Sequence, residues 1–123
     1  MSAAEEPVAK AAAEKAFARG AYPHFIDGSR TVDKASILDA IAEALSFPDY
    51  FGKNLDALYD CLTDLAWLPP GEHVLIWSGS TVLKDRDPKA YLAVRSVLSD
   101  AQRALGPSGD RSDSRRLTVV LPD

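Results

Sequence analysis

The sequence predicts an α/β fold, a small three-stranded parallel β-sheet flanked by helices, and three observations lead to this class. Apolar, strand-like segments occur at residues 22–27, 73–77 and 117–121, and segments with helical spacing separate them. The resulting order is β-α-α-β-α-β, in which each connection between strands can hold a right-handed helical crossover. The chain has 123 residues, which suits one domain with a single core.

The first strand and the first helix follow from turn and cap residues. Residues 22–27 (YPHFID) combine apolar and β-favouring side chains and end at an Asp-Gly turn. A helix to about Leu45 comes next, because apolar residues recur at helical spacing, and either Thr31 or Asp33 can cap its start. Pro48 stops this helix, since the residue before a proline is pushed out of the α region.

The middle of the chain holds a second helix and the second strand. Asn54 is a good N-cap for a helix that we expect to reach about Ala66. Residues 69–71 (PPG) form a turn, and residues 73–77 (HVLIW) make a nearly continuous apolar run. Such a run is typical of a strand that is covered on both faces.

The last part of the chain holds the third helix and the third strand. Residues 78–84 have room for one short turn of helix. Asp87 can cap a longer helix that has a proline in its first position and ends near Leu105, ahead of a Gly-Pro pair. Residues 107–116 are polar and form a loop, and residues 117–121 (LTVVL) are the last strand.

The N-terminal segment differs in composition from the rest. Residues 1–20 are rich in alanine and charge, which favours a helix, but they contain few large side chains that could anchor one in a core. We therefore expect residues 1–20 to be an N-terminal extension, helical or disordered, and residues 21–123 to form the folded domain.

Composition argues against several classes of function. The formal net charge is −4, which disfavours direct binding of nucleic acid, because phosphate recognition needs a basic surface. No apolar run is long enough to span a membrane, and the N-terminus carries glutamates where a signal peptide needs basic residues. A single cysteine cannot form an intrachain disulfide, as is usual in a reducing compartment. We expect a cytoplasmic protein that is monomeric when free.

The usual signatures of enzymes are absent from the sequence. It contains no GxGxxG, Walker, CxxC, HExxH or GxSxG pattern. His24 and His73 fall in or beside strands without the spacing of a metal site, so we expect both to be structural. Cys61 has little basic charge nearby to activate it, and we expect an inert, partly buried thiol. The sequence therefore predicts no catalytic residue, no metal and no cofactor.

Three aspartates on the second predicted helix are the most informative feature of the sequence. Asp56, Asp60 and Asp64 are each four residues apart, so their carboxylates lie along one stripe, opposite the leucines of the buried face. Like charges at this spacing cost a helix about 0.2–0.5 kcal/mol per pair. No lysine or arginine lies between Asn54 and Asp64 to compensate them. Stability alone gives no reason for this arrangement.

Aromatic residues border the stripe. Tyr50 and Phe51 precede Gly52 in what we expect to be an exposed turn, and Tyr59 lies at the edge of the stripe. Glycine allows backbone conformations that other residues avoid, so Gly52 is expected to permit a turn that brings Tyr50 beside the carboxylates. Exposed aromatic side chains beside uncompensated charge are typical of a protein-binding surface.

Other interpretations of the stripe are a cation site and a merely solvated surface. A linear ladder puts successive carboxylates about 6 Å apart, which is too spread to enclose one Mg²⁺ or Ca²⁺ ion. A solvated helix face usually mixes lysines with its acids, and this one does not. A carboxylate-dependent metal enzyme is disfavoured because the sequence offers no nucleophile, base or ligand cluster.

Residues 47–63 closely resemble the signature of the barstar family of ribonuclease inhibitors, through the long pattern P-x-[YF]-[YF]-G-x-N-x-D-A-L-x-D-x-L. The resemblance extends over about residues 22–123. It implies a small parallel sheet flanked by helices, and an intracellular inhibitor whose loop and acidic helix block the active site of a ribonuclease. The positions that match inhibitory contacts of the family are Tyr50, Asn54, Asp56 and Asp60. Among these, Asp60 matches the carboxylate that occupies a phosphate subsite.

Several positions depart from the family pattern. Tyr59 replaces a tryptophan, and Asp64 stands where the family has a glycine. A further acidic contact of the family matches either Asp85 or Asp87. These changes concern the rim of the expected interface, so they bear on which ribonuclease is bound more than on how it is bound.

The resemblance implies an inhibitor and not an enzyme, which binds a basic, barnase-like microbial ribonuclease one to one and contacts neither nucleic acid nor membrane directly. The alternative is an immunity or binding module of the same fold that neutralises a different basic nuclease toxin or partner protein. The expected partner-binding residues are Tyr50, Gly52, Asn54, Asp56, Tyr59, Asp60 and Asp64.

Overall fold

The computed structural model describes residues 5–106 and 114–122, with side chains from Val8 onward. The sequence predicted a polar loop at residues 107–116, and residues 107–113 of it lie outside these ranges. The elements are α1 (Glu5–Ala18), β1 (Tyr22–Asp27), the 3₁₀-helix η1 (Gly28–Arg30), α2 (Lys34–Ala44), α3 (Leu55–Asp64), β2 (Gly71–Ser78), α4 (Ser80–Arg86), α5 (Pro88–Leu105) and β3 (Arg115–Val120). The predicted α/β class and three-stranded parallel sheet are confirmed.

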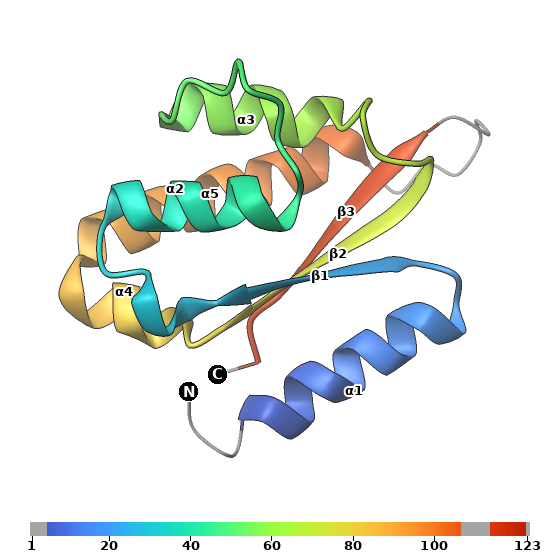
Figure 1. Ribbon diagram of the computed structural model, residues 1–123, viewed down its shortest axis with the longest axis horizontal. Coiled ribbons are helices and arrows are strands. Elements are labelled where there is room, and N and C mark those ends of the chain that lie inside the picture. The colour runs from blue at the N-terminus through green and yellow to red at the C-terminus, as the bar shows by residue number, and fades with distance from the viewer. Residues whose placement is uncertain (1–4, 107–113, 123) are drawn as a thin grey trace.

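The sheet separates two unequal layers of helices. Figure 1 shows α2, α3, α4 and α5 on one face of the sheet and α1 alone on the other. β2 is the central strand and pairs in parallel with β1 and β3. Its side chains alternate, so that Leu75 and Trp77 enter the main core while Val74 and Ile76 lie on the α1 side. The apolar run predicted for a strand covered on both faces is confirmed.

Local capping fixes where the helices begin. Asp33, and not Thr31, caps α2, because its carboxylate accepts a hydrogen bond of 2.9 Å from the backbone N–H of Ser36. The Ser36 hydroxyl oxygen in turn accepts one of 3.1 Å from the Asp33 N–H, which completes a capping box. The Thr31 hydroxyl donates instead to the Gly28 carbonyl at 2.8 Å. Asp87 caps α5 as expected.

The chain turns sharply after β2 into α4, a separate seven-residue helix where the sequence left room for one short turn. Gly79 makes this possible, because its φ of +69° is left-handed. Gly28, the first residue after β1, packs directly on the same turn, and a Cβ there would lie 2.3 Å from the Ser78 carbonyl oxygen. The backbone segments that follow β1 and β2 therefore come into close contact, because each has a glycine there.

Alanine side chains pack α1 against the sheet. The sequence left this segment either helical or disordered, and the structure has a helix over Glu5–Ala18. Ala9, Ala13 and Ala16 are buried in a cluster with Val74 and Ile76. Small side chains let the helix backbone come close to the strands, so the lack of large residues does not prevent packing.

Candidate functional site

α3 presents the aspartate stripe to solvent. Asp56, Asp60 and Asp64 are exposed, whereas Leu58 and Leu62 on the other side of the helix are fully buried in the main core. Among the residues that the structure describes, no lysine, arginine or histidine forms an ion pair with any of the three aspartates. The stripe is therefore an exposed row of negative charge on a helix that the core holds in place.

The negative charges on α3 are favourable at the N-terminal end of the helix dipole and unfavourable at its C-terminal end. Asp56 lies in the first turn, where a negative charge is favourable. Asp64 is the last residue of the helix, and the last turn contains no basic residue to offset it. A carboxylate at a helix C-terminus is destabilising. The position of Asp64 therefore does not stabilise the helix.

Asn54 fixes both the start of α3 and the end of the loop before it. Its side-chain oxygen accepts a hydrogen bond of 2.8 Å from the Ala57 N–H, which confirms the predicted N-cap. Its side-chain nitrogen donates to the Gly52 carbonyl at 3.3 Å. One side chain therefore sets where the stripe begins and how the loop reaches it.

Lys53, and not Gly52, has the unusual backbone conformation in this loop. Lys53 has a φ of +52°, whereas Gly52 is not among the residues with positive φ. A Cβ on Gly52 would lie 3.3 Å from the capping nitrogen of Asn54, so the glycine leaves room for the cap. Lys53 also forms an exposed ion pair with Asp39 of α2, with 3.3 Å between Nζ and Oδ1. Residue spacing did not predict this link to α2.

The aromatic residues beside the stripe differ in exposure. Tyr50 is 72% exposed and Tyr59 is 37% exposed, so both are accessible to a partner. Phe51, expected on the exposed turn, is instead half-buried and packs against the main core. The accessible aromatic surface therefore comes from the two tyrosines.

An aromatic cluster supports the loop from beneath. The Phe51 ring meets the Phe47 ring edge-on at 4.9 Å between centroids, and Trp67 meets Phe47 edge-on at 5.8 Å. The Trp67 indole N–H donates to the Leu45 carbonyl at 2.9 Å, beyond the end of α2. This cluster connects the segments before and after α3, and sequence spacing alone could not reveal it.

Three further positions that the sequence singled out are Cys61, Asp85 and Asp87. Cys61 is buried on the flank of α3, where burial raises the pKa of its thiol and the carboxylates of Asp64 and Asp60 raise it further. Both effects favour an unreactive thiol. Of the two candidates for a further acidic contact, Asp87 is engaged as the cap of α5, and Asp85 is exposed on α4.

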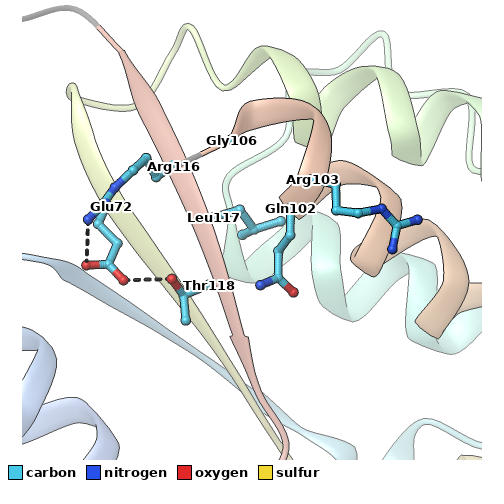
Figure 2. Close-up of a pocket in the computed structure, with 7 residues that line it drawn as sticks. All are labelled: Glu72, Gln102, Arg103, Gly106, Arg116, Leu117 and Thr118. Atoms are coloured by element: carbon cyan, nitrogen blue, oxygen red, sulfur yellow. Dashed lines mark hydrogen bonds and ion pairs between the residues drawn. The ribbon is translucent and has the colours of Figure 1, made fainter. Parts of the chain in front are cut away.

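A hollow of about 650 Å³ lies away from the stripe, between β3 and the end of α5. Glu72 is one of the residues that line it, and its carboxylate accepts hydrogen bonds from Thr118 at 2.6 Å and from Arg116 at 3.3 Å (Figure 2). None of the predicted partner-binding residues lines it. Within residues 5–106 and 114–122, no three His, Cys, Asp or Glu side chains gather closely enough to hold a metal ion. In the same ranges, no helix has the length and apolar character needed to cross a membrane.

Comparison with known proteins relates this chain to a protein family and to a curated bacterial protein. The family described as Barstar (barnase inhibitor) matches residues 22–121, from the first residue of β1 to just beyond β3. "Putative ribonuclease inhibitor YrdF" of Bacillus subtilis (strain 168) is 51% identical over 45 residues, which are 36% of this chain and 48% of that protein. The chain therefore matches about half the length of this relative.

Proposed function

This chain belongs to the barstar (barnase inhibitor) family, and from this premise we propose that it inhibits a basic, barnase-like ribonuclease by covering its active site with α3 and the preceding loop. One observation carries the proposal: Asp56, Asp60 and Asp64 form an exposed row of carboxylates without an ion-pair partner among the described residues. A surface of this kind is complementary to a cleft that binds phosphates.

The chemistry of a ribonuclease cleft explains why carboxylates suit it. Such a cleft holds RNA phosphates with arginine, lysine and histidine side chains. Carboxylates on a helix can occupy the same subsites, with Asp60 in a phosphate subsite and Asp56 beside it, and contacts between arginine and carboxylate are strong and often bidentate. The helix offers no phosphodiester bond, so the enzyme is blocked without cleaving its inhibitor.

Two tyrosines add apolar contact to the interface, one from the loop and one from α3, and the loop is held rigid. Tyr50 and Tyr59 supply large, accessible rings with few rotatable bonds, which is favourable at protein interfaces. The Asn54 cap and the packing of Phe51 hold the loop in one arrangement before binding. A preorganised surface loses less conformational entropy on association.

The proposal extends to how and where inhibition takes place. One inhibitor covers one active site, so the complex is one to one and the free inhibitor is a monomer. An inhibitor that protects the producing cell acts in its cytoplasm, in keeping with the single, unpaired cysteine. A second candidate, neutralisation of a different basic nuclease toxin, is favoured by the exposed Asp64, which stands where the family pattern has glycine.

An inhibition assay against a panel of small guanyl-preferring microbial ribonucleases tests the proposal. Asp60→Ala should raise the inhibition constant by at least about 30-fold, the size of a binding hot spot, while the protein stays folded. Glu14→Ala is the matched control, because Glu14 is exposed on α1 at the opposite face of the sheet. Equal inhibition by Asp60→Ala and wild type would contradict the central role of α3. Inhibition of a different nuclease alone would favour the second candidate.

A further inference from the structure

His24 and His73 lie in a row of three polar contacts that ends at a backbone carbonyl on each side. Nε2 of His24 lies 2.9 Å from Nδ1 of His73. The outer nitrogens both face carbonyl oxygens, with 3.2 Å from His24 Nδ1 to Ala44 and 2.8 Å from His73 Nε2 to Pro69. This row of contacts connects the last residue of α2, the strands β1 and β2, and the turn that follows α3.

The row of contacts requires three hydrogens, whereas two neutral imidazoles carry only two. A carbonyl can only accept, so each outer nitrogen must carry a hydrogen to bond with it. The contact between the two rings needs one more hydrogen, on one of the two facing nitrogens. A neutral pair therefore loses one of its three links, and a pair with one extra proton makes all three.

We propose that His24 and His73 act as a single-proton site, which binds one proton at Nδ1 of His24 and excludes a second proton while the fold is closed.

The longest of the three contacts is the link that the neutral pair gives up at the lowest cost. The contact between His24 and Ala44 is the longest of the three, at 3.2 Å. In the neutral pair both rings therefore carry their hydrogen on Nε2, and Nδ1 of His24 faces the Ala44 carbonyl without one. The added proton completes this contact at the C-terminal end of α2, where carbonyl groups and the helix dipole favour a cation.

The surroundings of His73 disfavour a charge there. His73 is fully buried, and the Tyr22 ring stacks on it at 5.1 Å between centroids. Burial lowers the pKa of His73, the bond to the Pro69 carbonyl raises it, and the Arg115 cation lowers it. Arg115 of β3 is held nearby by hydrogen bonds of 2.8 and 3.2 Å to the Leu68 carbonyl. A cation on His73 would therefore be poorly solvated and close to another cation.

The surroundings of His24 allow the pair of rings to bind only one added proton. Burial lowers the pKa of His24 and the neighbouring His73 lowers it further, whereas the bond to the Ala44 carbonyl raises it. A second proton on the pair would sit on His73 Nδ1 and point directly at the hydrogen on His24 Nε2. The two rings would have to separate, which would release Pro69 and the turn between α3 and β2. Strong acid is thus expected to open this turn.

Nitrogen NMR of the full ¹⁵N-labelled chain tests the proposal, because the sequence contains only two histidines. At neutral pH both rings should be the Nε2–H tautomer. On acidification His24 should become an imidazolium while His73 stays neutral, for as long as near-ultraviolet circular dichroism remains native. Conversion of both rings to imidazolium in the native protein would overturn the proposal, as would protonation of His73 first.

His24→Gln provides a second, independent measurement. Removing the neighbouring ring leaves Nδ1 of His73 free to bind a proton and donate it to the glutamine oxygen. His73 should then titrate at higher pH than in the wild type, and an unchanged His73 titration in a folded variant would contradict the proposal. Should the variant fail to fold, the tautomers and the titration of the wild type decide the matter alone.

Discussion

Arg19 and Glu72 join the end of α1 to the central strand by two parallel hydrogen bonds, 2.9 Å from Nε and 3.0 Å from Nη2. Thr118 and Arg116 of β3 donate to the same carboxylate (Figure 2). These contacts, led by the bond from Arg19, lower the pKa of Glu72 from 4.5 to about 2. One carboxylate thus connects α1, β2 and β3.

Glu72→Gln should make the protein less stable above pH 4.5 and change how its stability depends on pH. The folded-state pKa of Glu72 lies below its ordinary value, so its contribution is complete above 4.5 and is lost as the pH falls towards about 2. We expect a loss of about 1–2 kcal/mol in the free energy of unfolding at neutral pH. Urea unfolding at several pH values measures it, with Glu14→Gln as the control. A constant difference down to pH 3 or so would contradict this account.

The close packing of α1 predicts that its buried alanines tolerate no enlargement. Ala16 is fully buried between the helix and the sheet, whereas Ala11 is exposed on the same helix. Ala16→Leu should lower the free energy of unfolding by about 1–3 kcal/mol, because the extra carbons force the helix away from the strands. Ala11→Leu adds the same carbons in solvent and should leave stability nearly unchanged. Equal effects of the two changes would mean that α1 does not pack as described.

Sequence spacing identified the features that depend on near neighbours in the chain. The three strands, the Asn54 cap and the outward direction of the aspartate stripe follow from periodicities of two and 3.6 residues and from local hydrogen bonding. The left-handed conformation at Lys53 did not follow, because spacing does not show that the Asn54 side chain reaches back across Lys53 to the Gly52 carbonyl.

Contacts between residues far apart in the chain could not be predicted from the sequence. The pairing of His24 with His73 joins two strands whose register only the folded sheet defines. The packing of Trp67 on Phe47 and the burial of the α1 alanines likewise depend on which elements become neighbours. Alanine in a helix indicates helix propensity and carries no sign of what will cover it.

The cap of α3 should affect both stability and inhibition. Asn54→Ala removes the hydrogen bond to the Ala57 N–H and should cost about 1 kcal/mol in the free energy of unfolding. Asn54→Asp keeps an acceptor at the cap and should restore most of that stability. Neither variant can donate to the Gly52 carbonyl, so both should weaken inhibition, and Asn54→Asp should do so while it keeps most of the stability. Thermal unfolding and inhibition assays on the same two variants separate these effects. Equal stability of the two variants would contradict a capping role.

The exposed stripe predicts that association with the ribonuclease is steered by charge. Asp56, Asp60 and Asp64 add to the negative potential of one face, and their attraction for a basic cleft is screened over about 8 Å at physiological ionic strength. The association rate should therefore fall at least about tenfold between about 20 mM and about 500 mM salt, with a smaller change in the dissociation rate. Asp64→Asn should reduce this salt dependence, whereas Asp100→Asn on α5, which removes an equal charge beside Arg103, should reduce it less. Stopped-flow kinetics measure both rates, and an association rate indifferent to salt would exclude steering by the stripe.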